Sequence, residues 1–266
     1  MNDRIDLVAT DLDGTLLDPL KNVPSDFEDF VLSHKDINFV IASGRQYYNI
    51  LDLFPKCRDE LIFIAENGGL VYRNGQVLHK DTMSREDVDE CLKIFSDPEI
   101  CSLILCGVKS AYMLKSASKD CYDNSYLYYK RLDLVDSFEN IDDDILKIAI
   151  FVEGYRANAY YHEITAPNDR LECLLSGNCW IDISNKTVSK GAAMRRIMEI
   201  TGSSFETSMA FGDYLNDESL IKSCKFSYAM ANAHPDLKKL ALREAPSNED
   251  NGVMRVLYDV FDKEHE

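Results

Sequence analysis

The stretch that most constrains this chain is Asp-Leu-Asp-Gly-Thr at residues 11–15, which follows an apolar run at residues 5–9. An apolar run that stops at a glycine predicts a short buried strand followed by a tight turn. Two carboxylates, Asp11 and Asp13, therefore lie where a strand gives way to a loop. In open α/β sheets, ligands bind at this carboxyl edge of the strands. A solvated turn would show the same pattern, so its meaning depends on the rest of the chain.

Apolar runs and helical patterns alternate at both ends of the chain. Strands are expected at residues 38–42, 61–65, 208–211 and 226–230, and helices at 190–201 and 253–261. A further helix should begin within residues 24–28, where Ser25 can cap it and Glu28 can reach back, as in a capping box. Strands that alternate with helices predict an α/β fold with a parallel sheet.

The middle of the chain has a different character. Residues 70–80 predict a β-hairpin around Asn74-Gly75, and strands at 102–106, 111–115, 146–152 and 180–183 then outnumber helices. We expect an inserted α+β unit at residues 84–183 and a core made of residues 1–83 and 184–266. The insert has four tyrosines that could stack on a sugar, although their spacing favours packing in its core: Tyr122, Tyr126, Tyr128 and Tyr129.

Composition narrows the class of partner. The 266 residues carry 29 Lys and Arg against 46 Asp and Glu, a formal net charge of −17, which argues against nucleic acid and anionic membranes. No apolar run approaches a membrane span, and no targeting leader is seen before the first strand. The eight cysteines lack C-x-x-C pairs and zinc spacing, so we expect reduced thiols in a cytoplasmic protein. Oligomeric state is left open.

Four motifs at expected strand ends resemble, in order, those of the haloacid dehalogenase superfamily of hydrolases. They are Asp-Leu-Asp-Gly-Thr at 11–15, Ala-Ser-Gly-Arg at 42–45, Ser-Lys-Gly at 189–191 and Gly-Asp-Tyr-Leu-Asn-Asp at 212–217. The likeness covers the whole chain. Glu-Asn-Gly-Gly at 66–69 and residues 248–253 are similar to the Cof-type branch (subfamily IIB), often described as sugar phosphatases. The resemblance implies a Rossmann-like core and an inserted cap that governs substrate specificity.

Each motif also has a purely structural explanation. Ser43 can cap a helix, Lys190 can be a surface residue of a first helical turn, and Asp213 and Asp217 can cap the following helix. Only the complete set, each time at the same edge of a sheet, is hard to explain by structure alone.

Phosphate ester hydrolysis would need these residue types. A carboxylate about 4 Å from a phosphate is repelled by roughly 4 kcal/mol at an effective dielectric of about 20, so cations must neutralise charge. We expect Mg²⁺ on the side chains of Asp11 and Asp213 and the backbone carbonyl of Asp13. Asp11 would be the nucleophile that forms an aspartyl phosphate, and Asp13 the general acid and base.

The remaining site residues have supporting roles. Asp217 is expected to orient the metal shell and Lys190, and Thr15 to steady the loop. Arg45 is left open between a substrate contact and a pairing with an acid. The phosphoryl group and substrate are expected to contact Leu12, Ser43, Gly44 with its backbone N–H, Arg45, Lys190 and Asn216.

Three functions compete. The first is a Mg²⁺-dependent phosphatase of a small phosphorylated metabolite, above all a sugar phosphate. The second is a sugar phosphomutase or phosphotransferase of the same superfamily, with a second phosphate held by Arg131, Arg156 or Arg170. The third is a non-catalytic binding protein, against which the intact acidic and basic motif residues speak. Residues that choose the substrate are not identifiable in the sequence.

Overall fold

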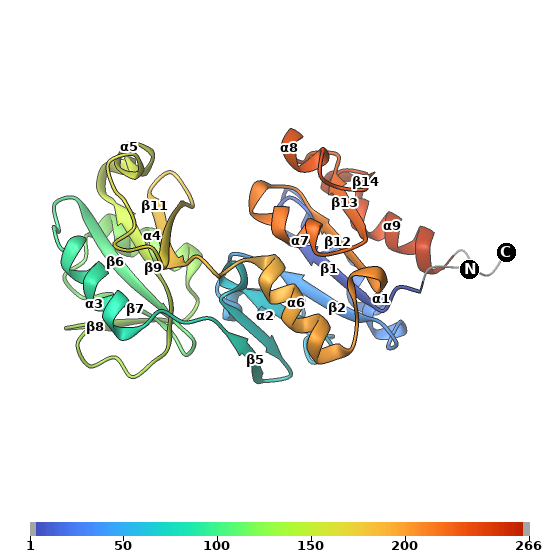
Figure 1. Cartoon of the computed structure of the whole chain (residues 1–266), viewed down its shortest axis with the longest axis horizontal. Coiled ribbons are helices and arrows are strands. Elements are labelled where there is room, and N and C mark those ends of the chain that lie inside the picture. Colours follow the sequence, from blue (N-terminus) through green and yellow to red (C-terminus); the bar gives the residue numbers. More distant parts are fainter. Residues whose placement is uncertain (1–3, 263–266) are drawn as a thin grey trace. The chain divides into compact units, whose positions relative to one another are not determined.

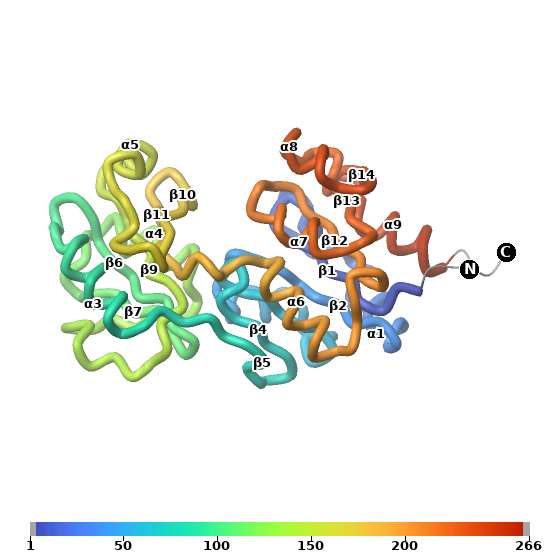
Figure 2. The backbone as a smooth tube through the Cα atoms, viewed as in Figure 1, coloured from blue at the N-terminus to red at the C-terminus, as the bar shows by residue number. Residues whose placement is uncertain are grey.

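The computed structural model describes residues 4–262 of the chain. Met1, Asn2 and Asp3, which bear on the expectation about a targeting leader, lie outside this range. The chain divides into two units (Figure 1). One contains the residues up to His79 and from Ser189 onward, and the other is Lys80–Val188. Figure 2 traces the same path, with the second unit in green and yellow.

Strand β1 (Leu7–Asp11) lies inside the eight-stranded sheet of the first unit, which has the order β14-β13-β12-β1-β2-β3-β4-β5. All neighbours from β14 to β3 run parallel, whereas β4 is antiparallel to β3. All five residues of β1 are buried, which explains why this strand is an almost continuous apolar run. The other strands are β2 (Asn38–Ala42), β3 (Ile62–Ala65), β4 (Leu70–Arg73), β5 (Gln76–Lys80), β12 (Ser208–Gly212), β13 (Phe226–Met230) and β14 (Arg243–Ala245).

Helices and short 3₁₀ turns connect these strands. They are α1 (Phe27–Ser33), α2 (Tyr47–Leu51), η1 (Glu66–Gly68), α6 (Lys190–Thr201), η3 (Phe205–Thr207), η4 (Leu215–Asp217), α7 (Glu218–Lys222), α8 (Pro235–Lys238), η5 (Asn248–Asp250) and α9 (Gly252–Phe261). Helices α1 and α9 pack together through Phe30 and Tyr258, whose ring centroids lie 5.3 Å apart. The α/β fold with a parallel, Rossmann-like sheet is therefore confirmed.

The capping box expected at Ser25 and Glu28 is wrong. Helix α1 begins at Phe27, and its N-cap is Asp26 without a side-chain cap bond. The Glu28 carboxylate instead accepts the backbone N–H groups of Lys56 and Cys57, at 2.7 and 3.1 Å. A contact with a distant segment has replaced the local one.

The second unit is a six-stranded sheet with the order β10-β11-β9-β6-β7-β8 and helices on it (Figure 1). Apolar clusters lie on both faces of its central strands: one contains Ile148 and Ile150 with α3, and the other Ala149 and Phe151 with α4. Its elements are α3 (Arg85–Ile94), β6 (Cys101–Gly107), β7 (Ala111–Leu114), α4 (Lys119–Tyr128), β8 (Leu132–Val135), β9 (Ile145–Val152), η2 (Glu153–Tyr155), α5 (Ala157–Tyr161), β10 (Leu171–Leu175) and β11 (Trp180–Asn185).

The expectation that four tyrosines pack in a core is wrong for three of them. Tyr122, Tyr126 and Tyr128 are 38%, 52% and 52% exposed, and only Tyr129 is buried. Helix α4, which the sequence analysis missed, turns two small residues, Cys121 and Ser125, inward. Its tyrosines consequently remain on the outside.

The two segments that lead into and out of the second unit are joined by hydrogen bonds. Asp81, on the segment that leads into the unit, accepts hydrogen bonds from the side chains of Asn185, at 2.7 Å, and Thr187, at 2.6 Å, on the segment that leads out. Asn185 also donates to the backbone carbonyl of Thr82, at 3.0 Å. These contacts join residues more than one hundred positions apart in the sequence.

The structure also bears on the expectations about the cysteines and about membrane spans. All eight cysteines are free thiols, and seven of them are buried, as expected for small core residues. Among residues 4–262, no helix combines the length and the apolar character that crossing a bilayer requires.

Candidate active site

Four neighbouring parallel strands end side by side, and each delivers a polar residue to the same edge of the sheet. Asp213 follows β12, Asp11 is the last residue of β1, Ser43 follows β2 and Glu66 follows β3. The strands are in register, with Asp11 opposite Ala42. Residues more than two hundred positions apart thus meet at the edge where open α/β sheets bind ligands.

Lys190 is the centre of a buried charge cluster. It is the first residue of α6 and is fully enclosed, with its Nζ 2.5 Å from Asp11 Oδ1 and 2.6 Å from Asp217 Oδ1. Burial alone would lower the pKa of Lys190, but the two carboxylates outweigh it and raise that pKa. Lys190 is therefore a buried cation, and the surface-residue explanation is excluded.

Asp217 binds Lys190 as expected, but its side chain does not cap the following helix α7. Its second oxygen accepts the backbone N–H groups of Asp213, at 3.0 Å, and Tyr214, at 3.2 Å, and so caps the turn η4. Its first oxygen binds Lys190. Since both oxygens are engaged, Asp217 fits a supporting position better than a position as a metal ligand.

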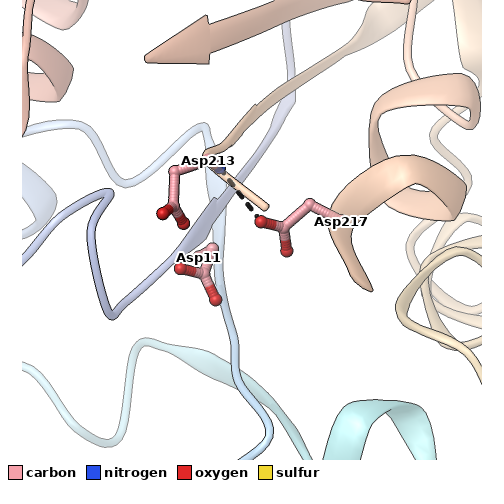
Figure 3. A group of neighbouring side chains, drawn as sticks. All are labelled: Asp11, Asp213 and Asp217. Carbon is pink, nitrogen blue, oxygen red and sulfur yellow. Dashed lines mark hydrogen bonds between the residues drawn. The ribbon is translucent and has the colours of Figure 1, made fainter. Parts of the chain in front are cut away.

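Three carboxylates converge at this edge of the sheet (Figure 3), and Lys190 contacts two of them. Asp11, Asp213 and Asp217 each offer an oxygen, and these oxygens lie within 4.8 Å of one another. Burial and the neighbouring Asp217 raise the pKa of Asp213 to about 6. Burial also raises the pKa of Asp11, and the charges of Asp217 and Asp213 add to this, although Lys190 opposes them. When all three carboxylates are ionised, they carry more negative charge than one lysine balances.

The donor set fits a hard divalent cation. Thr15 Oγ1 donates to Asp213 Oδ1 at 3.1 Å, and Lys190 occupies Asp11 Oδ1. In residues 4–262, no hydrogen-bond donor reaches the second oxygen of either Asp11 or Asp213. Gly14, at φ 88°, leaves room for this arrangement, because a Cβ there would lie 2.4 Å from Asp213 Oδ2. Two closely placed carboxylate oxygens are the ligands Mg²⁺ prefers.

The Asp13 carboxylate is held apart from that cluster by two cations. Arg45 donates to both of its oxygens and Lys21 Nζ lies 2.8 Å from Oδ1. Burial alone would raise the pKa of Asp13, but the bonds from Arg45 and Lys21 outweigh it and lower that pKa. Of the two roles left open for Arg45, the structure shows the pairing with an acid. Lys21 was missed, because a lysine in a loop eight residues after an acid carries no distinctive signal.

The residues expected to bind phosphate lie around this edge, with one restriction. The Leu12 side chain is fully buried, so only its backbone remains for a ligand. Ser43 is not a helix cap, since α2 is capped at Gln46, and its Oγ accepts the N–H of Arg45 at 3.2 Å. Asn216 is exposed and donates to Asn67 Oδ1 at 3.3 Å.

The arginines proposed for a second phosphate lie in the second unit. Arg170 is bound to the buried carboxylate of Asp87, with Nη2 2.6 Å from Oδ1. Arg156 Nε donates to the backbone carbonyl of Glu153 at 3.3 Å, and Arg131 is exposed. Arg170 thus has a structural partner already.

Comparison with known proteins gives concordant results. A family described as haloacid dehalogenase-like hydrolase matches residues 8–257. A 5-amino-6-(5-phospho-D-ribitylamino)uracil phosphatase of Escherichia coli K12 is 32% identical over 268 residues, which cover 97% of this chain and 96% of that protein. The crystal structure of SMU.1108c from Streptococcus mutans UA159 has a TM-score of 0.83 at 29% identity, over 97% of this chain and 99% of that one.

A more distant structure shares the fold. The subclass IIB sugar phosphatase BT4131 has a TM-score of 0.79 at 19% identity, over 96% of this chain and 100% of that one. At this identity the likeness concerns the fold alone.

Proposed function

Because this chain belongs to the haloacid dehalogenase-like hydrolases and its relatives are phosphatases, we propose that it is a Mg²⁺-dependent phosphatase of a small phosphorylated metabolite. The observation that carries the proposal is the buried cluster around Lys190. In it Asp11, the residue we propose as the nucleophile, contacts Lys190 and lies close to two further carboxylates. A surface ion pair would not need such burial, whereas charge that develops on a phosphoryl group does.

In the first step a carboxylate oxygen of Asp11 attacks phosphorus, and the bond from phosphorus to the ester oxygen breaks. The product is an aspartyl phosphate and an alcohol, which takes its proton from Asp13. In the second step Asp13 removes a proton from water, which attacks the same phosphorus and regenerates Asp11. Inorganic phosphate then leaves.

The surrounding residues neutralise and orient the phosphoryl oxygens. Lys190, the Ser43 hydroxyl, the Gly44 backbone N–H and the Asn216 amide are all donors at the strand edge. Asp217 keeps Lys190 in place, with 2.6 Å between Nζ and Oδ1. A bound Mg²⁺, held by Asp11, Asp213 and the Asp13 carbonyl, would supply Lewis acidity and offset the repulsion between carboxylate and phosphate.

We further propose that the substrate is the phosphate monoester of a sugar or of a polyol carried by a larger metabolite. The Escherichia coli relative is named for a phospho-ribitylamino-uracil, in which the phosphate is carried by a carbon chain with hydroxyl groups. The inserted unit, expected at residues 84–183, would act as the cap that selects among such esters.

The decisive experiment is a panel of phosphorylated metabolites that includes hexose phosphates, pentose phosphates and the ribitylamino-uracil phosphate. Release of inorganic phosphate is measured with Mg²⁺ and with excess chelator. Metal-dependent release from members of this panel is the expected result. Isomerisation of a sugar phosphate without release would instead establish a phosphomutase, and no turnover of any ester would favour a binding protein.

A further inference from the structure

The turn η1 (Glu66–Gly68) touches three separate parts of the phosphate site, and the proposed mechanism assigns it no role. The backbone N–H of Glu66 donates to the Arg45 carbonyl at 3.1 Å, and that of Asn67 to the Ser43 carbonyl at 3.0 Å. Gly68 lies against Ser189, where a Cβ would come within 2.3 Å of the carbonyl oxygen. The turn therefore links the loop after β2 to the start of α6.

The backbone of this turn has an uncommon conformation. Glu66, Asn67 and Gly68 all have positive φ, at 50°, 55° and 114°. Outside glycine, the left-handed region is uncommon, and asparagine enters it more readily than most other residues. The turn nevertheless keeps this conformation, and so it presents the Asn67 side chain in one direction.

The Asn67 side chain lies between two residues that are expected to bind phosphate. Its Oδ1 accepts a hydrogen bond from Asn216 Nδ2 at 3.3 Å. On the other side its amide fills the space next to Gly44, where a Cβ would lie 3.0 Å from both Oδ1 and Nδ2. Because Gly44 has no side chain, the Asn67 amide fits beside it and also contacts Asn216.

This contact decides which end of the Asn216 amide a phosphate meets. An amide presents either a donor, Nδ2, or an acceptor, Oδ1, and only the donor attracts phosphoryl oxygens. Asn216 is exposed and would otherwise be able to rotate. One Nδ2 hydrogen of Asn216 is directed to Asn67 Oδ1, and this bond holds the amide in one rotation. The second Nδ2 hydrogen then stays available to donate to a phosphoryl oxygen.

We propose that Asn67 is a positioning residue, which orients the Asn216 amide toward the phosphoryl group. The proposal rests on the phosphatase function proposed above. Asn67 itself needs no contact with the substrate, since its effect passes through Asn216.

The variant that tests this role is Asn67→Gly, because glycine keeps the positive φ and removes only the side chain. Asn74→Gly is the matched control: Asn74 also has positive φ, at 46°, but lies exposed in the β4–β5 turn. Turnover of p-nitrophenyl phosphate, binding of inorganic phosphate by calorimetry with Mg²⁺, and thermal unfolding are measured for both.

The proposal predicts that Asn67→Gly lowers kcat/KM by about 10- to 100-fold, the range of a misplaced binding group, and weakens phosphate binding. Its unfolding temperature should match that of Asn74→Gly, which should keep wild-type kcat/KM. In the double variant Asn67→Gly/Asn216→Ala, kcat/KM should fall little below that of Asn216→Ala alone, since the first residue acts through the second.

Two results would overturn the proposal: equal turnover and phosphate binding in Asn67→Gly and Asn74→Gly, or losses that multiply in the double variant. Failure of the proposed function looks different. A wild-type protein that binds inorganic phosphate but hydrolyses no ester would refute the phosphatase, while the binding comparison between the two glycine variants would still decide the role of Asn67.

Discussion

Arg45 holds the Asp13 carboxylate by both oxygens, with Nε 2.7 Å from Oδ2 and Nη2 2.6 Å from Oδ1. Lys21 contacts the same carboxylate, but its side chain is 57% exposed against 28% for Arg45. Exposed ion pairs contribute about 0–1 kcal/mol, whereas a bidentate arginine also fixes geometry. Arg45 should therefore be the residue that determines where the Asp13 carboxylate points.

We expect Arg45→Lys to reduce turnover of sugar phosphates by about tenfold or more, a part of the ~10²–10⁴-fold that general acid–base catalysis supplies. Lysine keeps the charge but cannot hold both oxygens. Lys21→Ala should change turnover far less. Steady-state kinetics of the two variants provide the comparison, and an equal or greater loss in Lys21→Ala would contradict this ranking.

The different roles of Asp11 and Asp13 should become visible with substrates whose leaving groups differ in how much they need a proton. Asp13→Asn cannot protonate an alkoxide, so sugar phosphates should lose about 10²–10⁴-fold in rate. A nitrophenyl ester departs without much protonation, so its first step should survive while the water step slows. Rapid-mixing kinetics should then show a burst of nitrophenol and an accumulating phosphoenzyme.

Asp11→Asn is the matched variant, and it should show neither burst nor turnover because the nucleophile is missing. Equal slowing of both ester types by Asp13→Asn, with no phosphoenzyme trapped, would make Asp13 a structural residue instead.

The stabilisation that Mg²⁺ gives should depend on pH because the metal binds to the acidic cluster. A carboxyl group whose pKa is raised in the folded protein binds more protons when folded than when unfolded. For Asp213, folding stability therefore falls as pH rises from the unfolded pKa, near 3.8, to the folded pKa, about 6. The raised pKa of Asp11 acts in the same direction. Mg²⁺ binds the ionised carboxylates and should therefore raise the unfolding temperature more at pH 7.5 than at pH 5.

Thermal unfolding with and without Mg²⁺ at the two pH values measures this effect. Asp213→Asn should abolish the gain, while Asp236→Asn, at an exposed carboxylate paired with Lys239, should retain it. A gain of the same size at both pH values would mean that Mg²⁺ does not bind this cluster.

Removal of the buried lysine should be costly for stability. Lys190→Met leaves Asp11 and Asp217 without a counter-charge, and breaking a buried pair in this way typically costs about 3–5 kcal/mol. Adding Asp217→Asn should restore part of the loss, as measured by urea unfolding. No loss in Lys190→Met would show that the carboxylates are neutral in the folded protein.

Lys147→Met is the control for this experiment. Lys147 and Asp182 form another largely buried pair, 2.8 Å apart, in the second unit. Its loss should lower stability while p-nitrophenyl phosphate is still hydrolysed. Abolished hydrolysis in this control would mean that losing a buried ion pair stops turnover through lost stability alone, so that activity could not report on the site role of Lys190.

The sequence predicted the central strands well because burial on both faces makes them continuous apolar runs. Residues 38–42 form β2 as expected, and the run at 146–152 lies within β9 (Ile145–Val152). Strands β8 and β10 were missed. Both lie at edges of their sheet and have partly exposed residues, so their apolar pattern is weak.

The motif residues could be located because each stands at the end of such a strand. Their partners could not. Lys21 meets Asp13 within one loop, and Asn67 meets Asn216 across 149 positions. Periodicity describes which face of a strand or helix is buried, but not which loop meets which, so contacts of this kind appear only once the strands are placed.

The hydrogen bonds from Asn185 and Thr187 to Asp81 have a consequence for how a chain can carry so long an insertion. An unstructured loop of about 105 residues costs more closure entropy than one of about 6, by roughly 2.5 kcal/mol at ~0.6 kcal/mol for each doubling. Because Asp81 joins the two ends of the insertion, 104 and 106 positions apart, the second unit closes this loop through its own contacts. Strand β5 and helix α6, which flank the insertion, then assemble as if a short turn joined them, and the inserted sequence can change in length without burdening the folding of the sheet.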